Sequence, residues 1–275
     1  MRSGRGVKIA VSIAAMLLVA PFVGLIVQAF ADRWFGRSLL PQSLGLRGVR
    51  EVWSDPVLTE AVINSLTVAT VVAIVAVVVA WPAARFLAET RSIAAWAMMA
   101  APVLLPPLVI GDGLATWFVR LGVTEHLAAI AIAHLAIAIP YAALGLVPAF
   151  TDELVELEQS AALSGAGPFR RMVDVVLPAA RRHVLIAFAL AFTVSWSQYG
   201  TSLAIGGGTP MLPLVLVPFV RSDPQIAAVL DLVFLLPPVI LLGAAAWSGK
   251  QPAPGQGNSH PESVSNGAFA ASKMT

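Results

Sequence analysis

Six long apolar runs restrict how this chain can fold more than any other feature. They occupy residues 7–30, 61–89, 93–119, 126–150, 183–206 and 225–247. About 20 apolar residues in a helix are enough to cross the hydrocarbon core of a bilayer. In lipid, only helices and closed barrels satisfy their own backbone groups. The runs therefore predict an all-α, polytopic membrane protein with about six transmembrane helices.

The composition agrees with this fold class. The 275 residues are 58% hydrophobic and only 12% charged, whereas soluble domains are about one quarter charged. There is no cysteine, which excludes disulfides, thiolate catalysis and Cys-ligated metal sites. The net charge is only +2, so the basic pI reflects loop arginines and does not indicate a nucleic-acid surface.

The two ends of the chain and the first connection are less regular. Basic residues precede the first run, as in a signal peptide, but a signal core is only about 7–15 residues long. We therefore expect residues 7–30 to form a retained first helix. The polar stretch 31–60 contains Pro41 and Pro56 and is expected to form at most short helices. Residues 248–275 are rich in Gly, Pro, Ser, Asn and Gln, which predicts a disordered tail.

Two of the apolar segments carry helix-breaking residues. The third run contains Pro102, Pro106, Pro107 and the sequence Gly111-Asp112-Gly113, so it is expected to be kinked or broken. The Pro-containing loop 209–224, which follows the fifth run, has room for a re-entrant piece.

The stretch 151–182, between the fourth and fifth runs, is too polar to span a bilayer. Thr151 and the two acids after it are typical of a helix start. Gly165 lies in a Ser-Gly-Ala-Gly break that predicts a sharp turn, and Pro168 then starts a second helix. We expect that helix to end at Leu177-Pro178. Such a helical hairpin either packs on its own membrane domain or docks a soluble protein, and the pattern leaves both possibilities open.

The hairpin resembles the signature loop of bacterial ABC importer permeases. In that family the loop reads EAA, three residues, Gly, nine residues, Ile, one residue, Leu-Pro. Here Gly165, Val175 and Leu177-Pro178 keep the spacing, while Gln159-Ser160-Ala161 stands in place of EAA and a Glu lies one position early. The resemblance implies a coupling helix seated on an ATPase subunit. The residues implied to dock are Glu158, Gln159, Ala161, Gly165, Pro168, Phe169, Arg170, Val175, Leu177 and Pro178.

The resemblance also implies partners and a division of the chain. Residues 1–247 would be the transmembrane permease domain, with 151–182 as its coupling loop, and 248–275 a cytoplasmic tail. The partners would be cytoplasmic ATP-binding subunits, a second permease subunit (identical or related), a periplasmic solute-binding protein and membrane lipid.

Charge on the connecting loops predicts the orientation. With six spans, both termini and the hairpin lie on one side of the membrane, and by the positive-inside rule the side richer in Lys and Arg is cytoplasmic. That side carries Arg2, Arg5, Lys8, Arg85, Arg91, Arg170, Arg171, Arg181, Arg182, Lys250 and Lys273. The other side carries Arg33, Arg37, Arg47, Arg50, Arg120 and Arg221.

Catalytic motifs are missing from the sequence. No G-x-x-x-x-G-K-[ST] phosphate loop occurs, so the chain is not expected to hydrolyse ATP or to be an enzyme. The four His residues lack metal-ligand spacing, and no metal or cofactor is expected. His134, in the middle of the fourth run, is expected to be a packed or hydrogen-bonded residue and not a proton relay.

Polar residues within the runs predict a solute path. At 1.5 Å per residue, Asp112 and Asp231 would each lie about 9 Å inside the outer boundary, and other polar or aromatic residues fall at a similar level. The residues of this predicted path are Asn64, Thr67, Asp112, Trp196, Gln198, Tyr199 and Asp231. Acids at this depth suit a cationic solute such as a polyamine or thiamine, with ferric iron or an oxyanion as the alternative. A solvated helix break at Asp112 and a helix cap at Asp231 would explain the same acids without a solute.

A different class of protein also fits the polar residues. In a secondary transporter or channel, intramembrane carboxylates would couple transport to protons or sodium. The six runs show no matched halves, which many such transporters have. That alternative would also make the spacing from Gly165 to Pro178 a coincidence.

Overall fold

The computed structural model describes residues 3–34, 38–90 and 92–248. Within them, five helices are long and apolar enough to cross a membrane, and one bent pair makes a sixth if it is counted as a single span. This confirms the predicted all-α, polytopic fold. The last helix ends at Ser248. The rest of the tail expected over residues 248–275 lies outside the described residues.

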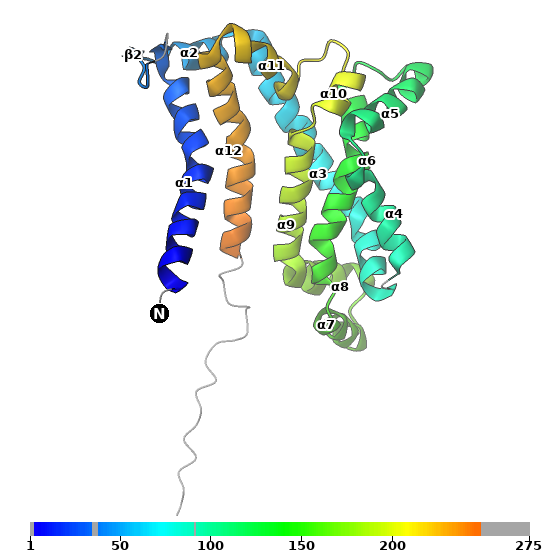
Figure 1. Ribbon diagram of the computed structural model, residues 1–275. Coiled ribbons are helices and arrows are strands. Elements are labelled where there is room, and N and C mark those ends of the chain that lie inside the picture. Colours follow the sequence, from blue (N-terminus) through cyan, green and yellow to red (C-terminus); the bar gives the residue numbers. More distant parts are fainter. Residues whose placement is uncertain (1–2, 35–37, 91, 249–275) are drawn as a thin grey trace, which may run out of the picture.

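The spanning helices alternate with short elements at both ends (Figure 1). The long helices are α1 (Ser3–Ala29), α3 (Pro56–Thr90), α6 (Leu127–Leu146), α9 (Leu177–Trp196) and α12 (Pro224–Ser248). The shorter ones are α2 (Arg47–Ser54), α4 (Ile93–Leu104), α5 (Pro107–Leu121), α7 (Asp152–Leu163), α8 (Pro168–Arg171), α10 (Gly200–Ile205) and α11 (Leu212–Ser222). A 3-10 turn, η1 (Val147–Ala149), follows α6, and a π-helical segment, η2 (Met172–Val176), joins α8 to α9.

The core lies where α3, α6 and α9 meet. One face of α3 carries fully buried alanines at positions 69, 73, 76, 80 and 84. Such small residues let helix backbones approach closely in a membrane protein. α6 and α9 approach each other closely, because a Cβ atom added to Gly145 would lie 2.6 Å from the Cα atom of Ala187. The apolar runs predicted the helices, but this stripe decides which of them pack together.

The third span is broken, as predicted, and the break lies at Leu105-Pro106. The axes of α4 and α5 differ by 92°. Pro106 and Pro107 have no N–H to donate, and a residue before proline avoids the helical region. Gly111-Asp112-Gly113, which the sequence made a candidate for the break, lies inside α5 instead.

The fifth span differs from the prediction at both ends. It was expected to run from 183 to 206 as one helix, after a hairpin helix ending at Leu177-Pro178. Instead the helical course is continuous from Pro168 to Trp196, and α10 follows only after a non-helical segment. The π-type bond from the Leu177 N–H to the Met172 carbonyl shifts the hydrogen-bond register just before Pro178. The missing N–H of Pro178 is therefore accommodated without ending the helix.

The region 31–60 contains more than short helices. Strands β1 (Ala31–Arg33) and β2 (Ser43–Leu44) form a small antiparallel pair before α2. Asp55 then caps α3, its Oδ1 atom accepting from the Val57 N–H at 2.8 Å, and Pro56 occupies the first helical position. Figure 1 places β2, α2 and α11 together at one end of the molecule.

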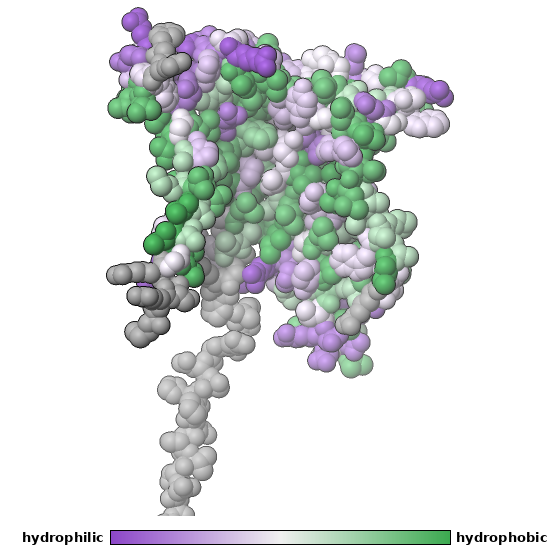
Figure 2. All heavy atoms as spheres, in the orientation of Figure 1, coloured by the Kyte–Doolittle hydropathy of each residue, from purple (hydrophilic) through white to green (hydrophobic). Residues whose placement is uncertain are grey.

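The two ends of the bundle are polar and the middle is apolar. Figure 2 shows hydrophilic residues gathered at both ends, with hydrophobic residues on the helices between them. The hairpin of α7 and α8 lies at the same end as the start of α1 and the end of α12 (Figure 1). The start of the first helix and the end of the last helix thus lie at the same end of the bundle, as expected for an even number of membrane crossings.

Candidate coupling surface and solute path

The hairpin turn is built by local backbone bonds. Thr151 caps α7, its Oγ1 atom accepting from the Leu154 N–H at 3.3 Å. At the other end, the Ala166 N–H donates to the Ala161 carbonyl and the Gly165 N–H to the Ala162 carbonyl, each at 3.0 Å. These two bonds form a Schellman motif, which requires a left-handed residue at its turn. Gly165 supplies it with φ of +85°, as the sequence predicted.

The second helix starts as predicted and then joins the membrane domain. Gly167 is its N-cap and Pro168 its first residue. Since no break separates α8, η2 and α9, the hairpin's second arm and the fifth span form one continuous helix. A displacement of the hairpin would therefore move the spanning helix with it.

Two kinds of contact hold α7 against the bundle. Leu154 on α7 and Val176 on η2 are buried, so the inner face of the hairpin packs on its own domain. The carboxylate of Glu158 pairs with Arg85 near the end of α3. Glu158 is the acid that stands one position early in the motif, and the structure gives it a partner within the chain.

Much of the predicted docking set is open to solvent. Gln159, Gly165, Pro168, Phe169, Arg170, Leu177 and Pro178 are exposed, while Glu158, Ala161 and Val175 are half-buried. Phe169 is 80% exposed and Leu163 is 91% exposed. Leu163 was not among the residues predicted to dock. We call the exposed apolar residues of the hairpin, Leu157, Leu163, Phe169, Met172, Val173 and Leu177, the docking surface.

The predicted path residues lie in different environments. Asn64 is buried and donates from Nδ2 to the Pro210 carbonyl at 3.1 Å, tying α3 to the segment before α11. Thr67, on the same helix, is exposed. Tyr199 is 42% exposed beside the α9–α10 break. The exposed members could border a path only together with another molecule.

The two predicted acids lie in different surroundings. Asp112 is an exposed residue of α5, and because α5 is bent away from α4, its predicted depth of about 9 Å along a straight helix does not hold. Asp231 is half-buried within α12, so it does not cap a short helix. No ion pair to Asp231 is found in the described part of the chain.

Trp196 is a packing residue in this structure. It is buried, its Nε1–H donates to the Phe234 carbonyl at 2.7 Å, and its ring stacks with those of Phe192 and Phe234. The contacts with Phe234 join α9 to α12. Trp196, a residue of the predicted path, therefore has its ring occupied by packing within the chain.

A buried polar network surrounds the start of α10. Gln198 accepts at Oε1 from the Thr201 hydroxyl at 2.9 Å. His134 lies 2.9 Å from the Ser195 hydroxyl through Nδ1 and 3.1 Å from the Ser202 hydroxyl through Nε2. This confirms His134 as a hydrogen-bonded residue between helices. The sequence could not name its partners, because they lie more than 60 positions away along the chain.

The network fixes which nitrogen of His134 carries the proton. The single hydroxyl proton of Ser202 is donated to the Gln198 carbonyl at 2.7 Å, so its oxygen can only accept from His134. We therefore assign the neutral imidazole with its proton on Nε2, and the Ser195 hydroxyl then donates to Nδ1. Both nitrogens are satisfied without a charge.

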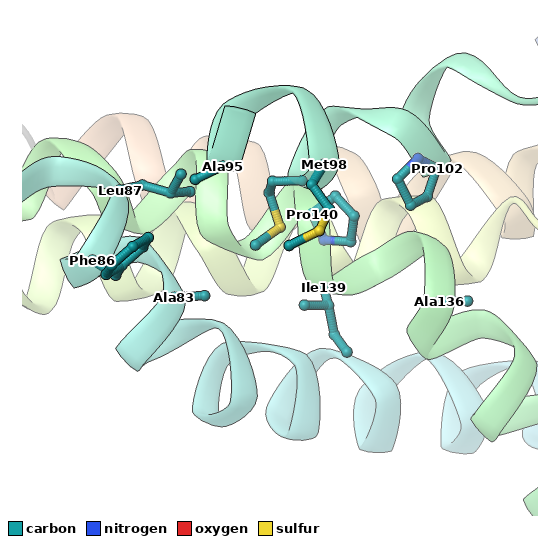
Figure 3. A pocket seen from close by; sticks show the side chains of 10 residues that line it. Ala83, Phe86, Leu87, Ala95, Met98, Pro102, Ala136, Ile139 and Pro140 are labelled. Atoms are coloured by element: carbon teal, nitrogen blue, oxygen red, sulfur yellow. The ribbon is translucent and has the colours of Figure 1, made fainter. Parts of the chain in front are cut away.

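A separate cavity of about 310 Å³ lies between α3, α4 and α6. Figure 3 shows Met98 and Pro140 near its centre and Phe86 at its side. Its lining is Ala83, Phe86, Leu87, Ala95, Met98, Met99, Pro102, Ala136, Ile139 and Pro140. No side chain in this set is charged, and none belongs to the predicted path.

At the end opposite the hairpin, charged residues tie α12 to α2. Arg47 pairs with both carboxylate oxygens of Asp223, at 2.8 and 3.0 Å. Oδ1 of Asp223 also accepts from the Gln225 and Ile226 N–H groups at the start of α12. The hydrogen bond from Arg47 is the main cause that lowers the pKa of Asp223 below its usual value. Across residues 3–34, 38–90 and 92–248, no cluster of three or more His, Cys, Asp or Glu is placed to hold a metal ion.

Two permease proteins are similar to this chain in sequence. The chain is 30% identical over 162 residues to the molybdenum transport system permease protein ModB of Azotobacter vinelandii, covering 53% of this chain and 72% of that protein. It is 27% identical over 248 residues to the putrescine transport system permease protein PotI of Escherichia coli, covering 84% of this chain and 85% of that protein. No family profile matches the sequence.

A solved structure shares the fold. The crystal structure of a bacterial ABC transporter involved in the import of the acidic polysaccharide alginate matches with a TM-score of 0.66 at 17% identity. The match covers 91% of this chain and 99% of the matched chain.

Proposed function

This chain belongs to the permease subunits of ABC importers, and from that premise we propose that it couples solute passage to a separate ATPase docked on its α7–α8 hairpin. It is a multi-pass membrane protein and not an enzyme, because in this family ATP hydrolysis takes place in a partner subunit. This membership removes the alternative of a secondary transporter.

The observation that carries the proposal is the docking surface. Leu163 and Phe169 flank the hairpin turn and expose most of their side chains. Buried Leu154 and Val176 already hold the inner face of the hairpin to the bundle. Leu163 and Phe169 thus pack little within the chain itself, and large exposed apolar residues in a polar setting are typical of an interaction site.

The continuous helix from Pro168 to Trp196 supports coupling. ATP would close two ATPase subunits, draw the hairpins of two permease subunits together and tilt this helix. ADP release would reverse the tilt. The spans would then open alternately to the two sides of the membrane.

The solute path is proposed to form between two permease subunits. Thr67, Asp112 and Tyr199 are exposed in the single chain, and the cavity between α3, α4 and α6 is apolar. A second permease subunit, identical or related, would enclose the path, and a periplasmic binding protein would deliver the solute to it.

We propose a cationic solute, because Asp231 is a half-buried acid on a spanning helix without an ion-pair partner in the described residues. A carboxylate in such a place is costly unless it faces water, a partner or a cargo. The names of the relatives divide between molybdenum and putrescine, so an oxyanion remains the second candidate.

The proposed orientation puts the hairpin and both termini in the cytoplasm. The positive-inside rule supports it, and α5 and α11 lie at the end opposite the hairpin (Figure 1). Reporter fusions after Val119 and within 209–224 should read periplasmic, and one within 164–167 cytoplasmic. A periplasmic reading at the hairpin would contradict the docking proposal.

Copurification with the cognate ATPase subunit tests the docking surface. We expect Leu163→Ser and Phe169→Ser to reduce the copurified ATPase at unchanged permease level. Leu39→Ser is the matched control, because Leu39 is 92% exposed but lies on the loop between β1 and β2 at the other end of the molecule. Normal copurification of both hairpin variants, or an equal loss in the control, would overturn the proposal.

A further inference from the structure

The course of the chain changes between α9 and α10. α9 ends at Trp196 and α10 begins at Gly200, so three residues separate them. Figure 1 shows α10 displaced from the line of α9 and lying beside α5. A short non-helical link of this kind lets two helices change their relative angle unless other contacts fix it.

His134 holds both sides of this break. Its Nδ1 atom accepts from Ser195, which precedes the break on α9, and its Nε2–H donates to Ser202, which follows the break on α10. His134 itself belongs to α6 and is completely buried. We infer that His134 is a positioning residue, a latch that fixes the angle between α9 and α10.

α5 is attached to α10 more closely than to its own neighbour in sequence. A Cβ atom on Gly111 would lie 3.0 Å from the Thr201 Cα atom, and one on Gly200 would lie 2.8 Å from the Leu108 backbone nitrogen. The two helices are therefore in backbone contact. α5 is also separated from α4 by the break at Leu105-Pro106, so α5 and α10 form one unit bounded by two breaks.

The latch gives this unit a place in transport, a consequence that rests on the proposed function. The continuous helix carries a displacement of the hairpin as far as Trp196. Beyond that point, α10 and α5 follow only if the α9–α10 angle is held. With the latch intact they move with α9, and Tyr199 and Asp112 move with them.

Hydrogen exchange on the full chain in lipid nanodiscs tests the latch directly. We expect Ser195→Ala to speed amide exchange within 197–206 about tenfold, because a buried partner of His134 is left unsatisfied. Exchange within α6 and the first half of α9 should change little. Ser195→Ala removes one hydroxyl and no carbon, so the variant is expected to fold.

Two further variants separate hydrogen bonding from packing. His134→Gln keeps one acceptor and one donor, whereas His134→Leu keeps neither at similar bulk. The amides of 197–206 should be closer to their native protection from exchange in His134→Gln than in His134→Leu. Adding Ser195→Ala to His134→Leu should cause no additional loss, because the bond is already absent.

Ser65→Ala is the matched control. Ser65 is a buried serine of α3 whose hydroxyl accepts from the Leu212 N–H of α11 at 2.8 Å, so its bond joins two helices that do not flank the break. Ser65→Ala should lower the melting temperature without selectively speeding amide exchange within 197–206. The proposed latch is wrong if Ser195→Ala leaves amide exchange within 197–206 as slow as in the native chain. It is also wrong if Ser195→Ala speeds exchange there no more selectively than Ser65→Ala does. Because neither an ATPase nor a solute is present, this failure is distinct from failure of the docking proposal.

Discussion

The guanidinium group of Arg85 on α3 lies 3.0 Å from the carboxylate of Glu158 on α7. It also pairs with Glu89 on its own helix at 2.8 Å. Arg85 thus links the spanning helix α3 to α7, the first helix of the hairpin. The contact is partly exposed, so it is suited to fixing the position of α7 more than to stabilising the fold.

We predict that Glu158→Gln weakens coupling with little loss of stability. The free energy of unfolding should fall by about 0.5 kcal/mol, as for other partly exposed ion pairs. In the reconstituted complex, more ATP should be hydrolysed per solute transported. The reversed pair Arg85→Glu with Glu158→Arg should recover part of the coupling. Glu89→Gln is the control, and coupling that falls equally there would contradict a specific role for Glu158.

Gly165→Val should disrupt the hairpin turn. At φ of +85° a β-branched residue costs about 1–2 kcal/mol. An added Cβ would meet no atom within 4 Å, so the cost is backbone strain alone. We expect less copurified ATPase and less uptake, with the protein still in the membrane.

Two substitutions in the same turn serve as controls. Gly165→Asn should be milder, because Asn tolerates left-handed geometry. Gly167→Val should be tolerated, because Gly167 has φ of −66° and open space around its Cβ position. Normal uptake by a well-expressed Gly165→Val variant would favour a hairpin that only packs on its own domain.

The Arg47–Asp223 pair should make stability depend on acid pH. Its hydrogen bond lowers the pKa of Asp223 from the usual 3.8, so the folded state binds the proton less readily than the unfolded state. The contribution is present above pH 3.8 and is lost as the pH falls through the lowered pKa of folded Asp223. Asp223→Asn should therefore lower the melting temperature at neutral pH, by an amount worth about 0.5–1 kcal/mol.

The difference between native protein and Asp223→Asn should vanish at the acid end of a pH series. Glu51→Gln is the control, because Glu51 also contacts Arg47 at 3.2 Å but is more exposed. A difference between native and Asp223→Asn melting temperatures that stays constant from neutral pH to about pH 2 would show that the carboxylate charge is not its source.

The proposed cationic solute predicts unequal effects of the two acids. With putrescine as the probe and matched expression, Asp231→Asn should reduce uptake about tenfold, the loss expected for one charge-assisted contact. Asp112→Asn, at an exposed position, should have a smaller effect. Normal uptake by both variants would mean that the carboxylates are structural. A cognate binding protein that selects molybdate would overturn the cation proposal.

The sequence alone determined the local features of this protein. Long apolar runs must become helices in lipid, because no other backbone form there satisfies its own hydrogen bonds. The turn at Gly165 and the start at Pro168 were predictable because each depends on the backbone freedom of a single residue. The resemblance of the hairpin to one family was also predictable, because it depends on residue spacing within a single segment.

Only the three-dimensional structure decided the course of the helices and everything that depends on contacts between distant segments. Pro178 was expected to end a helix, but the π-helical segment before it lets the helix continue. Asp112 was assigned a depth on a straight helix, and the 92° bend removed it from that position. The partners of His134 and of Glu158 lie on other helices, and the alanine stripe of α3 and the glycines between α5 and α10 set which helices meet. Because bilayer lipid is as apolar as the helices themselves, hydrophobicity predicts the spans but not their packing, which small residues and buried polar contacts decide.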